Sequence, residues 1–209
     1  MIRMSMTTNK PFAEVISSSL IQWTAQCWEW DHFPLFGSLA AIETDKKTFI
    51  GIVFKVETGS SDPSRTPFMY QKTEQELRQE HPHIFTFLKT SFSCLPIGYY
   101  EKGHVHYFLP DNPAKIHAFV SPLSHELQAL FFVSSAYVPL LFALQAEIFN
   151  IDELLLALLS WQARHHFLTT DRIMEFMEYY TLLTGNEYRR LKTFTMRIAH
   201  IAPEKKKIY

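Results

Sequence analysis

The chain has 209 residues, of which 47% are hydrophobic and 20% are charged, a composition that excludes an intrinsically disordered protein. The formal net charge is −1, so no overall basic field draws nucleic acid to the molecule. The two cysteines, Cys27 and Cys94, lie far apart and show neither a CxxC motif nor zinc-ligand spacing, which favours free thiols in a reducing compartment.

The first residues, MIRMSMTTNKPF, lack the apolar segment of a secretory signal peptide, and we therefore expect a cytoplasmic protein. Residues 127–146 carry no formal charge and are numerous enough to span a bilayer. Polar side chains and Pro139 within this segment, and acidic residues on both sides of it, argue against insertion. We expect no membrane contact and predict that the segment is buried against the rest of the protein.

The first half of the chain begins with strand patterns. Residues 12–30 alternate apolar and polar side chains at near period two, which indicates one bent strand or two short ones. Residues 38–44 and 48–57 flank the polar triplet DKK and predict a hairpin. Gly51, inside the second of these strands, indicates a bulge or a close approach of the backbone.

A helical insertion then interrupts the strands. Thr73 and Glu76 have the spacing of a capping box, which predicts a helix that starts there. Residues 93–101 and 104–110 flank a Lys-Gly turn and predict a second hairpin, and residues 116–122 predict the last strand.

The pattern becomes helical after residue 122. No glycine occurs between Gly103 and Gly185, and Gly185 is placed to end a helix. Ser124, Asn150 and Thr170 are the expected N-cap residues of three helices, and the segment NEYRRLKTFTMRIAHI predicts a final one.

These elements predict an α+β protein in two parts. About six short strands joined by tight turns, with one helical insertion, favour a small closed β-barrel, because closure removes the exposed edges of an open sheet. The barrel is expected to comprise residues 12–122, and an all-α C-terminal domain is expected to comprise residues 123–203.

Two blocks of the β-rich half resemble a known family. The first block is FGSLAAIETDKKTFIGIVFKVETGS, in which two predicted strands flank a turn. The first strand follows a glycine and the second strand contains one. The second block is CLPIGYYEKGHVHYFLPDNPAKIHAFVSPLS. It contains, in this order, a glycine, a turn, the pair Leu-Pro, a further proline and the pair Ile-His, and this order is similar to that of the closing strands of HAS-barrel domains. Over residues 12–122 the chain therefore resembles the HAS-barrel family, named for HerA-type DNA translocases and rotary ATP synthase subunits. The loop DPSRTPFMYQKT is similar to that of short bacterial stand-alone members.

The resemblance implies a barrel that acts as a docking or assembly collar, usually beside an ATPase. This chain departs from the family because no GxxxxGK[ST] motif follows the barrel, so we expect neither nucleotide hydrolysis nor a cofactor. We expect a non-enzymatic protein whose barrel binds a protein partner, either an ATPase on another chain or a second copy of itself. The apolar helices after residue 124 are expected to supply an oligomer interface.

Two other functions stay open from the sequence. Aromatic residues of the barrel, such as Tyr99 and Tyr107, would form a stacking platform in an accessory protein that binds single-stranded nucleic acid. His104 and His106 share one face of a strand, and together with His117 they would build the site of a metal-dependent hydrolase. The sequence offers no carboxylate or cysteine at supporting spacing and no GxSxG motif, so we expect no metal and no catalytic residue.

Candidate partner-binding residues come from three segments. The loop that begins at Thr58 has a turn-forming Asp-Pro pair, and we expect its aromatic residues to pin it onto the mouth of the barrel, which suits recognition. The alternative is a structural connector in which the loop's arginine pairs with a carboxylate. The basic face of the last helix is suited to phosphates or to an acidic protein surface. The full candidate set is Arg65, Phe68, Tyr70, Lys72, Tyr99, Tyr107, Arg189 and Arg190.

Overall fold

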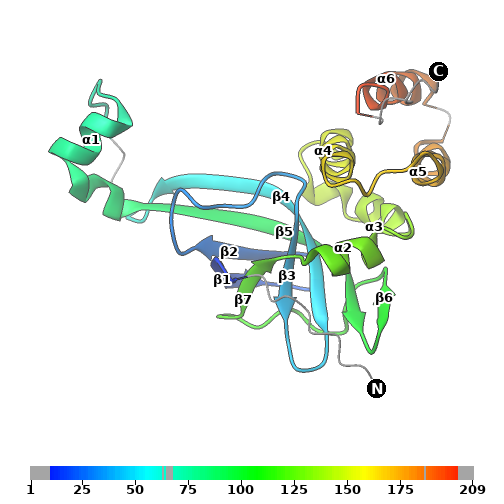
Figure 1. Ribbon diagram of the computed structural model, residues 1–209, viewed down its shortest axis with the longest axis horizontal. Coiled ribbons are helices and arrows are strands. Elements are labelled where there is room, and N and C mark those ends of the chain that lie inside the picture. Colours follow the sequence, from blue (N-terminus) through cyan, green and yellow to red (C-terminus); the bar gives the residue numbers. More distant parts are fainter. Residues whose placement is uncertain (1–9, 63, 65–67, 186, 202–209) are drawn as a thin grey trace, which may run out of the picture.

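The computed structural model describes residues 10–62, 64, 68–185 and 187–201. Strands occupy the chain up to residue 122, interrupted by one helical insertion, and helices follow (Figure 1). The strands are β1 (Ala13–Ser18), β2 (Trp23–Cys27), β3 (Leu39–Glu43), β4 (Thr48–Ser60), β5 (Leu88–Glu101), β6 (His104–His106) and β7 (Phe119–Pro122). The helices are α1 (Glu74–Glu80), α2 (His125–Phe131), α3 (Val138–Ala143), α4 (Ile151–Arg164), α5 (Thr170–Thr184) and α6 (Tyr188–Ile198), with short 3-10 helices η1 (Pro82–Phe87) and η2 (Gln145–Glu147).

The strands form an antiparallel barrel. Their order is β2-β1-β7-β3-β4-β5-β6, and β2 also pairs with β5, so that six strands close on themselves and β6 is added to one end of β5. The closing pairs join residues 23–26 of β2 to residues 91–94 of β5. The predicted closed barrel is confirmed, and residues 12–30 form two short strands within it.

Trp23 fills the inside of the barrel. Its side chain is 2% exposed and packs edge-on against Phe92. An added Cβ on Gly51 would lie 2.9 Å from this indole, and the register of β4 against β5 shifts beside Gly51. The bulge and the close backbone approach that the sequence indicated as alternatives are therefore both present, because the indole needs the space that Gly51 leaves.

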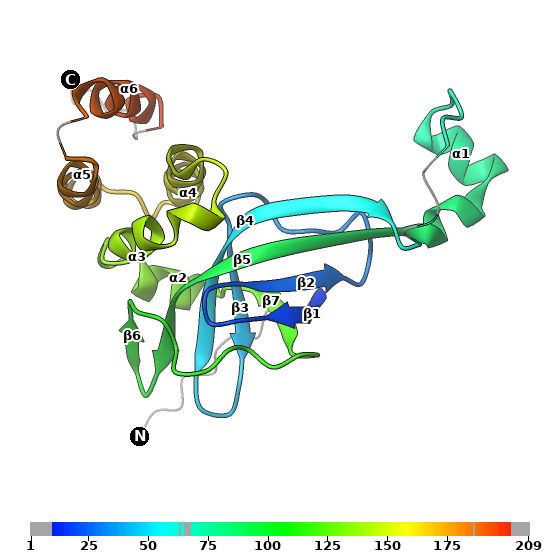
Figure 2. The ribbon, with the colours of Figure 1, turned by 180° about the vertical axis from the view of Figure 1, so that it is seen from behind.

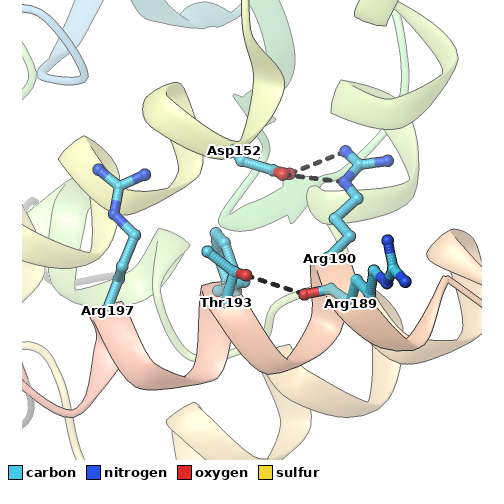
Figure 3. A pocket seen from close by; sticks show the side chains of 6 residues that line it. Asp152, Arg189, Arg190, Thr193 and Arg197 are labelled. Carbon is cyan, nitrogen blue, oxygen red and sulfur yellow. Dashed lines mark hydrogen bonds and ion pairs between the residues drawn. The ribbon is translucent and has the colours of Figure 1, made fainter.

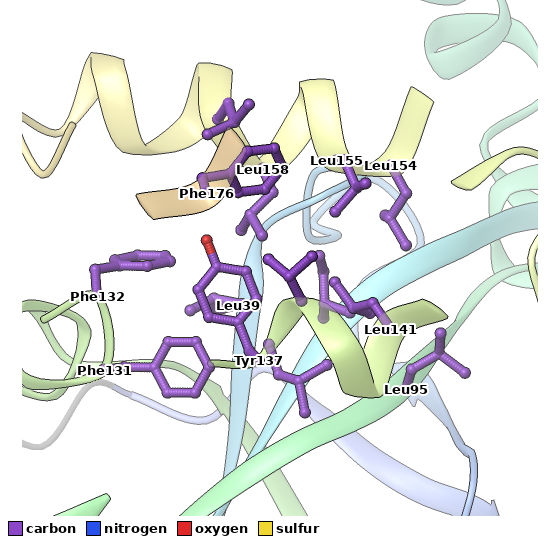
Figure 4. Packing of buried hydrophobic residues seen from close by; sticks show 14 of the residues in the cluster. Leu39, Leu95, Phe131, Phe132, Tyr137, Leu141, Leu154, Leu155, Leu158 and Phe176 are labelled. Atoms are coloured by element: carbon purple, nitrogen blue, oxygen red, sulfur yellow. The ribbon is translucent and has the colours of Figure 1, made fainter. Parts of the chain in front are cut away.

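The helices after β7 cover one side of the barrel. Leu39 and Leu95, from barrel strands, face Tyr137, Leu141 and other helical residues across a single hydrophobic core (Figure 4). The described residues after Pro122 are helical outside their connecting segments, but the apolar side chains of these helices are buried together with those of β3, β4 and β5. A separate all-α domain over residues 123–203 therefore stays a prediction.

Residues 127–146 pack against this core through most of their large apolar side chains, whereas Leu130 and Val133 are exposed. They are divided among α2, α3 and η2, and Pro139 lies in the first turn of α3. Leu127, Phe131 and Leu141 are each at most 2% exposed. Across the described ranges of the chain, each helix is too short or too polar to cross a lipid bilayer.

Helix caps follow the sequence closely. The side chains of Ser124 and Asn150 accept hydrogen bonds from backbone N–H groups of α2 and α4, and Gly185 ends α5 with a φ of 59°. The predicted cap of α5 was wrong by one residue, because the hydroxyl of Thr169, not of Thr170, accepts the N–H of Arg172.

β4 and β5 continue past the barrel as an arm, which we define as residues 58–90. The ladder between them runs on to the pair Ser60 and Leu88, and α1 and η1 lie at its end (Figures 1 and 2). The predicted capping box of Thr73 and Glu76 is present at the start of α1. Strand β4 therefore extends further than the predicted end at residue 57, and β5 starts earlier than residue 93.

We expect Gly37→Ala to lower the free energy of unfolding by about 2–4 kcal/mol, measured by urea denaturation. Gly37 has a φ of +78°, and an added Cβ would lie 2.6 Å from the Cβ of Ala157 on α4. The loop before β3 would have to move away from the helical layer.

Gly59→Ala is the matched control, since an added Cβ on Gly59 meets no atom within 4 Å. Its effect should stay within about 0.5 kcal/mol. Equal losses in the two variants would show that the contact between Gly37 and α4 does not constrain the fold.

Candidate functional site

The predicted partner-binding residues lie on three separate surfaces. Phe68, Tyr70 and Lys72 lie on the arm tip, defined here as residues 68–87, and Arg65 lies outside the described residues. Tyr99 lies in β5, and Tyr107 directly follows β6. Arg189 and Arg190 lie on α6. Because α1 and α6 are at opposite ends of the molecule (Figures 1 and 2), the candidate residues do not converge on one site.

Arg78 of α1 fastens the arm tip to the loop that follows β2. Its Nη2 lies 3.0 Å from Asp31 Oδ2 and 2.8 Å from Glu74 Oε1. Its guanidinium lies 4.7 Å from the ring centre of Phe85, and the Trp30 ring stacks on Phe85 at 5.7 Å. The carboxylates raise the pKa of Arg78, and this cross-link holds the end of a two-stranded ribbon that would otherwise be weakly supported.

The arm tip presents two adjacent apolar side chains to solvent. Phe68 is 77% exposed and Met69 is 83% exposed. Phe68 meets Tyr70 edge-on at 5.5 Å, and Tyr70 packs on His81 at 5.2 Å. The expectation that Phe68 and Tyr70 pin the loop onto the barrel mouth was wrong, because their ring contacts are on the tip itself.

The arm tip also carries charged groups that are paired within it. Lys72 forms an ion pair with Glu80. Hydrogen bonds from the backbone and hydroxyl of Thr73 lower the pKa of Glu76, which keeps that carboxylate ionised in the capping box. The arm tip therefore consists of the acidic helix α1, whose start is fixed by the capping box, and the exposed apolar pair Phe68 and Met69.

The aromatic residues near β6 are used inside the chain. Tyr99 is 8% exposed, stacks on His106 at 4.8 Å, and has Lys47 Nζ 4.7 Å from its ring centre. The hydroxyl of Tyr107 donates a hydrogen bond of 2.7 Å to the carbonyl of Phe131, and burial raises its pKa. These two rings join β6 to its neighbours in the chain.

The three histidines of the hydrolase hypothesis have different partners. His104 Nδ1 lies 3.1 Å from the carbonyl of Lys102, and His117 Nδ1 lies 2.5 Å from Glu14 Oε1, whereas His106 stacks on Tyr99. In the part of the chain that the structure describes, no three His, Cys, Asp or Glu side chains are grouped to hold a metal ion.

Neither cysteine is set up as a nucleophile. Burial raises the pKa of the Cys27 thiol to about 11, and it also raises that of Cys94, which lies inside the barrel. Both groups are therefore thiols at neutral pH, and the thiolate form that attacks substrates is disfavoured.

Arg190 attaches α6 to the helices beneath it. Its Nε and Nη2 each donate a hydrogen bond of 2.8 Å to the carboxylate of Asp152 on α4 (Figure 3). The hydroxyl of Tyr180 on α5 donates to the same carboxylate at 3.1 Å. Asp152 raises the pKa of Arg190 still further above its ordinary value, so this candidate partner-binding residue is occupied within the chain.

A second pair, Arg197 and Glu153, joins the same helices at the surface. The two hydrogen bonds are 2.6 and 2.9 Å long, and Arg197 lowers the pKa of Glu153. Arg189 and Lys192 are exposed and form no ion pair with another described residue. A pocket of about 240 Å³ lies between α4 and α6, lined by Asp152, Arg189, Arg190, Thr193, Phe194 and Arg197.

Comparison with the models of known protein families and with curated protein sequences found no match to this chain. The resemblance to HAS barrels therefore stays a prediction. The function has to be argued from the geometry of the three surfaces.

We expect the pair of Asp152 and Arg190 to contribute a coupling energy of about 1–3 kcal/mol in a double-mutant cycle with alanine. The two side chains are 22% and 28% exposed, and aromatic rings lie beneath the guanidinium. Urea denaturation of the two single variants and the double variant measures the coupling.

The pair of Glu153 and Arg197 is the control on the same two helices. These side chains are 47% and 46% exposed, so their coupling should stay below about 1 kcal/mol. A larger coupling for the exposed pair would contradict the assignment of Arg190 as the residue that attaches α6.

Proposed function

We propose that the chain is a non-enzymatic docking protein and that the arm tip binds a protein partner. The observation that carries this proposal is the exposure of Phe68 and Met69, 77% and 83%, side by side at the end of the arm. Water-exposed apolar side chains gain stability when a partner covers them, and such a pair at a projecting end is accessible to another molecule.

The construction of the arm suits binding. Arg78, the capping box and the ladder of β4 and β5 hold the tip in place before a partner arrives. A segment that is ordered in advance loses little conformational entropy on binding, so more of the contact energy is available as affinity.

The chemistry of the site also favours contact over catalysis. Phe68 and Met69 have no titratable group, Lys72 is paired with Glu80, and Glu76 is committed to the capping box. The buried thiols of Cys27 and Cys94 and the absence of a GxxxxGK[ST] motif from the sequence point the same way.

The class of partner follows from the resemblance. HAS barrels act as collars beside ATPases, and this chain lacks the nucleotide-binding motif. An ATPase on another chain is therefore the proposed partner, with the barrel as the support from which the arm reaches it.

The test is capture of partners from a native lysate by the tagged protein, followed by mass spectrometry. A partner retained by the wild type should be reduced at least about tenfold by the double substitution Phe68→Ser and Met69→Ser, and Arg65→Ala should also weaken its capture. The stability of the double variant should change by less than about 0.5 kcal/mol, because both side chains are exposed.

Phe149→Ser is the matched control, since Phe149 is fully exposed but lies between η2 and α4, away from the arm. Recovery of an ATPase that depends on Phe68 and Met69 supports the collar. A partner that is kept by the tip variant and lost by the Phe149 variant would contradict the proposal.

A further inference from the structure

We propose that the partner binds the arm by adding an extended segment of its own chain, as an extra strand, to the outer edge of β4. This inference rests on the proposed function, because it names the kind of segment that the arm recognises. Unpaired backbone groups, the side chains beside them and the path of the arm carry it.

Strand β4 lacks a second neighbour over part of its length. Its pairing with β3 covers residues 48–52, whereas its pairing with β5 runs on to Ser60. Beyond β3, the N–H of Val53 donates to the carbonyl of Ser38, and the carbonyl of Val53 accepts the N–H of Gly37. Residues 56–60, defined here as the open edge, therefore have β5 on one side and no strand of the described chain on the other.

The backbone groups of the open edge alternate in direction. The N–H of Ser61 donates to the carbonyl of Phe87, which continues the register of β4 with β5, so the residues two and four positions before Ser61 also face β5. The N–H and C=O groups of Val56, Thr58 and Ser60 therefore point away from β5. Within the described ranges of the chain, these three N–H groups donate to no acceptor.

This row of backbone groups matches an extended segment. The outward groups recur at every second residue, about 7 Å apart, and a strand presents its own N–H and C=O groups at the same repeat. A helix has already used its backbone groups internally. The chemistry of the open edge therefore selects a partner that contributes a strand.

The features that commonly block such pairing stop short of the open edge. The bulge between Val53 and Lys55, and Lys55 itself, come before it. The sequence of the open edge is VETGS, which has no proline and one charged residue, Glu57. Glu57 forms an ion pair of 2.8 Å with Lys55. An incoming strand therefore meets neither a missing N–H group nor an unpaired charge.

The side chains beside the edge indicate the pattern of the added segment. Val56 and Thr58 lie on one face of β4, and Lys55 and Glu57 lie on the other face. Val56 packs against the apolar cluster inside the barrel, whereas the side chains of Lys55 and Glu57 are 54% and 62% exposed. A segment that alternates apolar and polar residues fits this edge, with its apolar side chains beside Val56.

The open edge leads to the arm tip. Strand β4 ends at Ser60, and the arm carries α1 away from the barrel (Figures 1 and 2). Main-chain hydrogen bonds along the edge give affinity for any extended segment, and the exposed pair Phe68 and Met69 adds apolar contact at the end of the arm. The partner is therefore recognised at two adjoining parts of one projecting structure.

Amide hydrogen exchange of the free chain, resolved by NMR, tests whether the edge is open. The amides of Val56 and Thr58 should exchange at least about tenfold faster than those of Glu57 and Gly59, because the latter two donate to β5. Slow exchange at all four positions would show that the edge is already covered and would overturn the proposal.

Peptides selected from a random phage-displayed library on the immobilised full chain are the probe for binding. The synthetic peptides should bind the wild type and lose at least about tenfold in affinity for Thr58→Pro, which removes an outward N–H group and keeps the bonds to β5. Thr58→Val is the matched control, because it keeps that N–H group and removes the hydroxyl that pairs with Thr90. Its affinity should stay within about twofold of the wild type.

Circular dichroism and urea denaturation establish that the proline variant is folded. A library that yields no binding peptide, or peptides that bind the proline variant as tightly as the wild type, would contradict strand addition.

Methylation of the peptide nitrogens makes the same test on the unchanged protein. An added strand directs every second N–H group toward β4 and the others toward solvent. Methylation of one alternate set should weaken binding at least about tenfold, and methylation of the other set should leave it unchanged. Equal losses for both sets, or no loss for either, would exclude strand addition.

The outcome is separable from that of the proposed function. If the lysate partner depends on Phe68 and Met69 but is captured equally by Thr58→Pro, the arm tip is the docking surface and strand addition is wrong. If peptides bind the open edge with the expected alternation and the tip variant keeps every lysate partner, strand addition stands and the role of the arm tip is wrong.

Discussion

The pairing of β2 with β5 is the constraint on which the rest of the molecule depends. Residues 91–94 of β5 lie between β4 on one side and β2 on the other, and Tyr99 and Tyr100 lie between β4 and β6. One long strand thus closes the barrel, carries β6 and continues into the arm. The hydroxyls of Thr24 and Ser93, 2.9 Å apart, and of Thr58 and Thr90, 2.7 Å apart, bridge strands near this closure. The direction of the arm is therefore set by the barrel.

The helical layer is tied to the same strands by a shared core. Leu95 and Ile97 of β5 are fully buried against helical residues, and Gly98, with a φ of +152°, allows the carbonyl of His106 to approach where a side chain would clash. The barrel is thus buried on its inner face around Trp23 and on part of its outer face beneath the helices. An arrangement of this kind favours cooperative folding of barrel and helices, and it leaves the arm tip and the outer face of α5 and α6 as the parts that project.

Local signals in the sequence predicted local structure well. The alternation of residues 12–30 predicted one bent strand or two short ones, of which the second is present, and the spacing of Thr73 and Glu76 predicted the start of α1. The extension of β4 to Ser60 was missed, because a ribbon exposed on both faces has no apolar alternation and its sequence reads as a polar loop. The cap of α5 was misplaced because two adjacent threonines satisfy the same rule.

Long-range partners were beyond the reach of sequence patterns. Arg78 binds Asp31, 47 positions away, and Arg190 binds Asp152, 38 positions away, so neither pair produces a spacing that can be recognised. Arg190 was predicted as a partner-binding residue from the basic face of the last helix, and Tyr107 from the aromatic residues of the barrel. A specific hydrogen-bond acceptor gives each of them a role within the chain. Phe68 was predicted as a partner-binding residue because it lies in the loop after Thr58. Its position at the far end of an arm depends on the long pairing of β4 with β5, which the sequence did not predict.

Hydrogen exchange of the backbone amides of β2, resolved residue by residue by NMR, tests the closed barrel most directly. Successive amides of this strand point alternately toward β1 and toward β5. A closed barrel predicts that all of them exchange slowly, by global unfolding, and that amides at the arm tip exchange faster. Alternating fast and slow exchange along residues 23–26 would mark β2 as a free edge and would contradict the closure from which the arm and the helical layer take their positions.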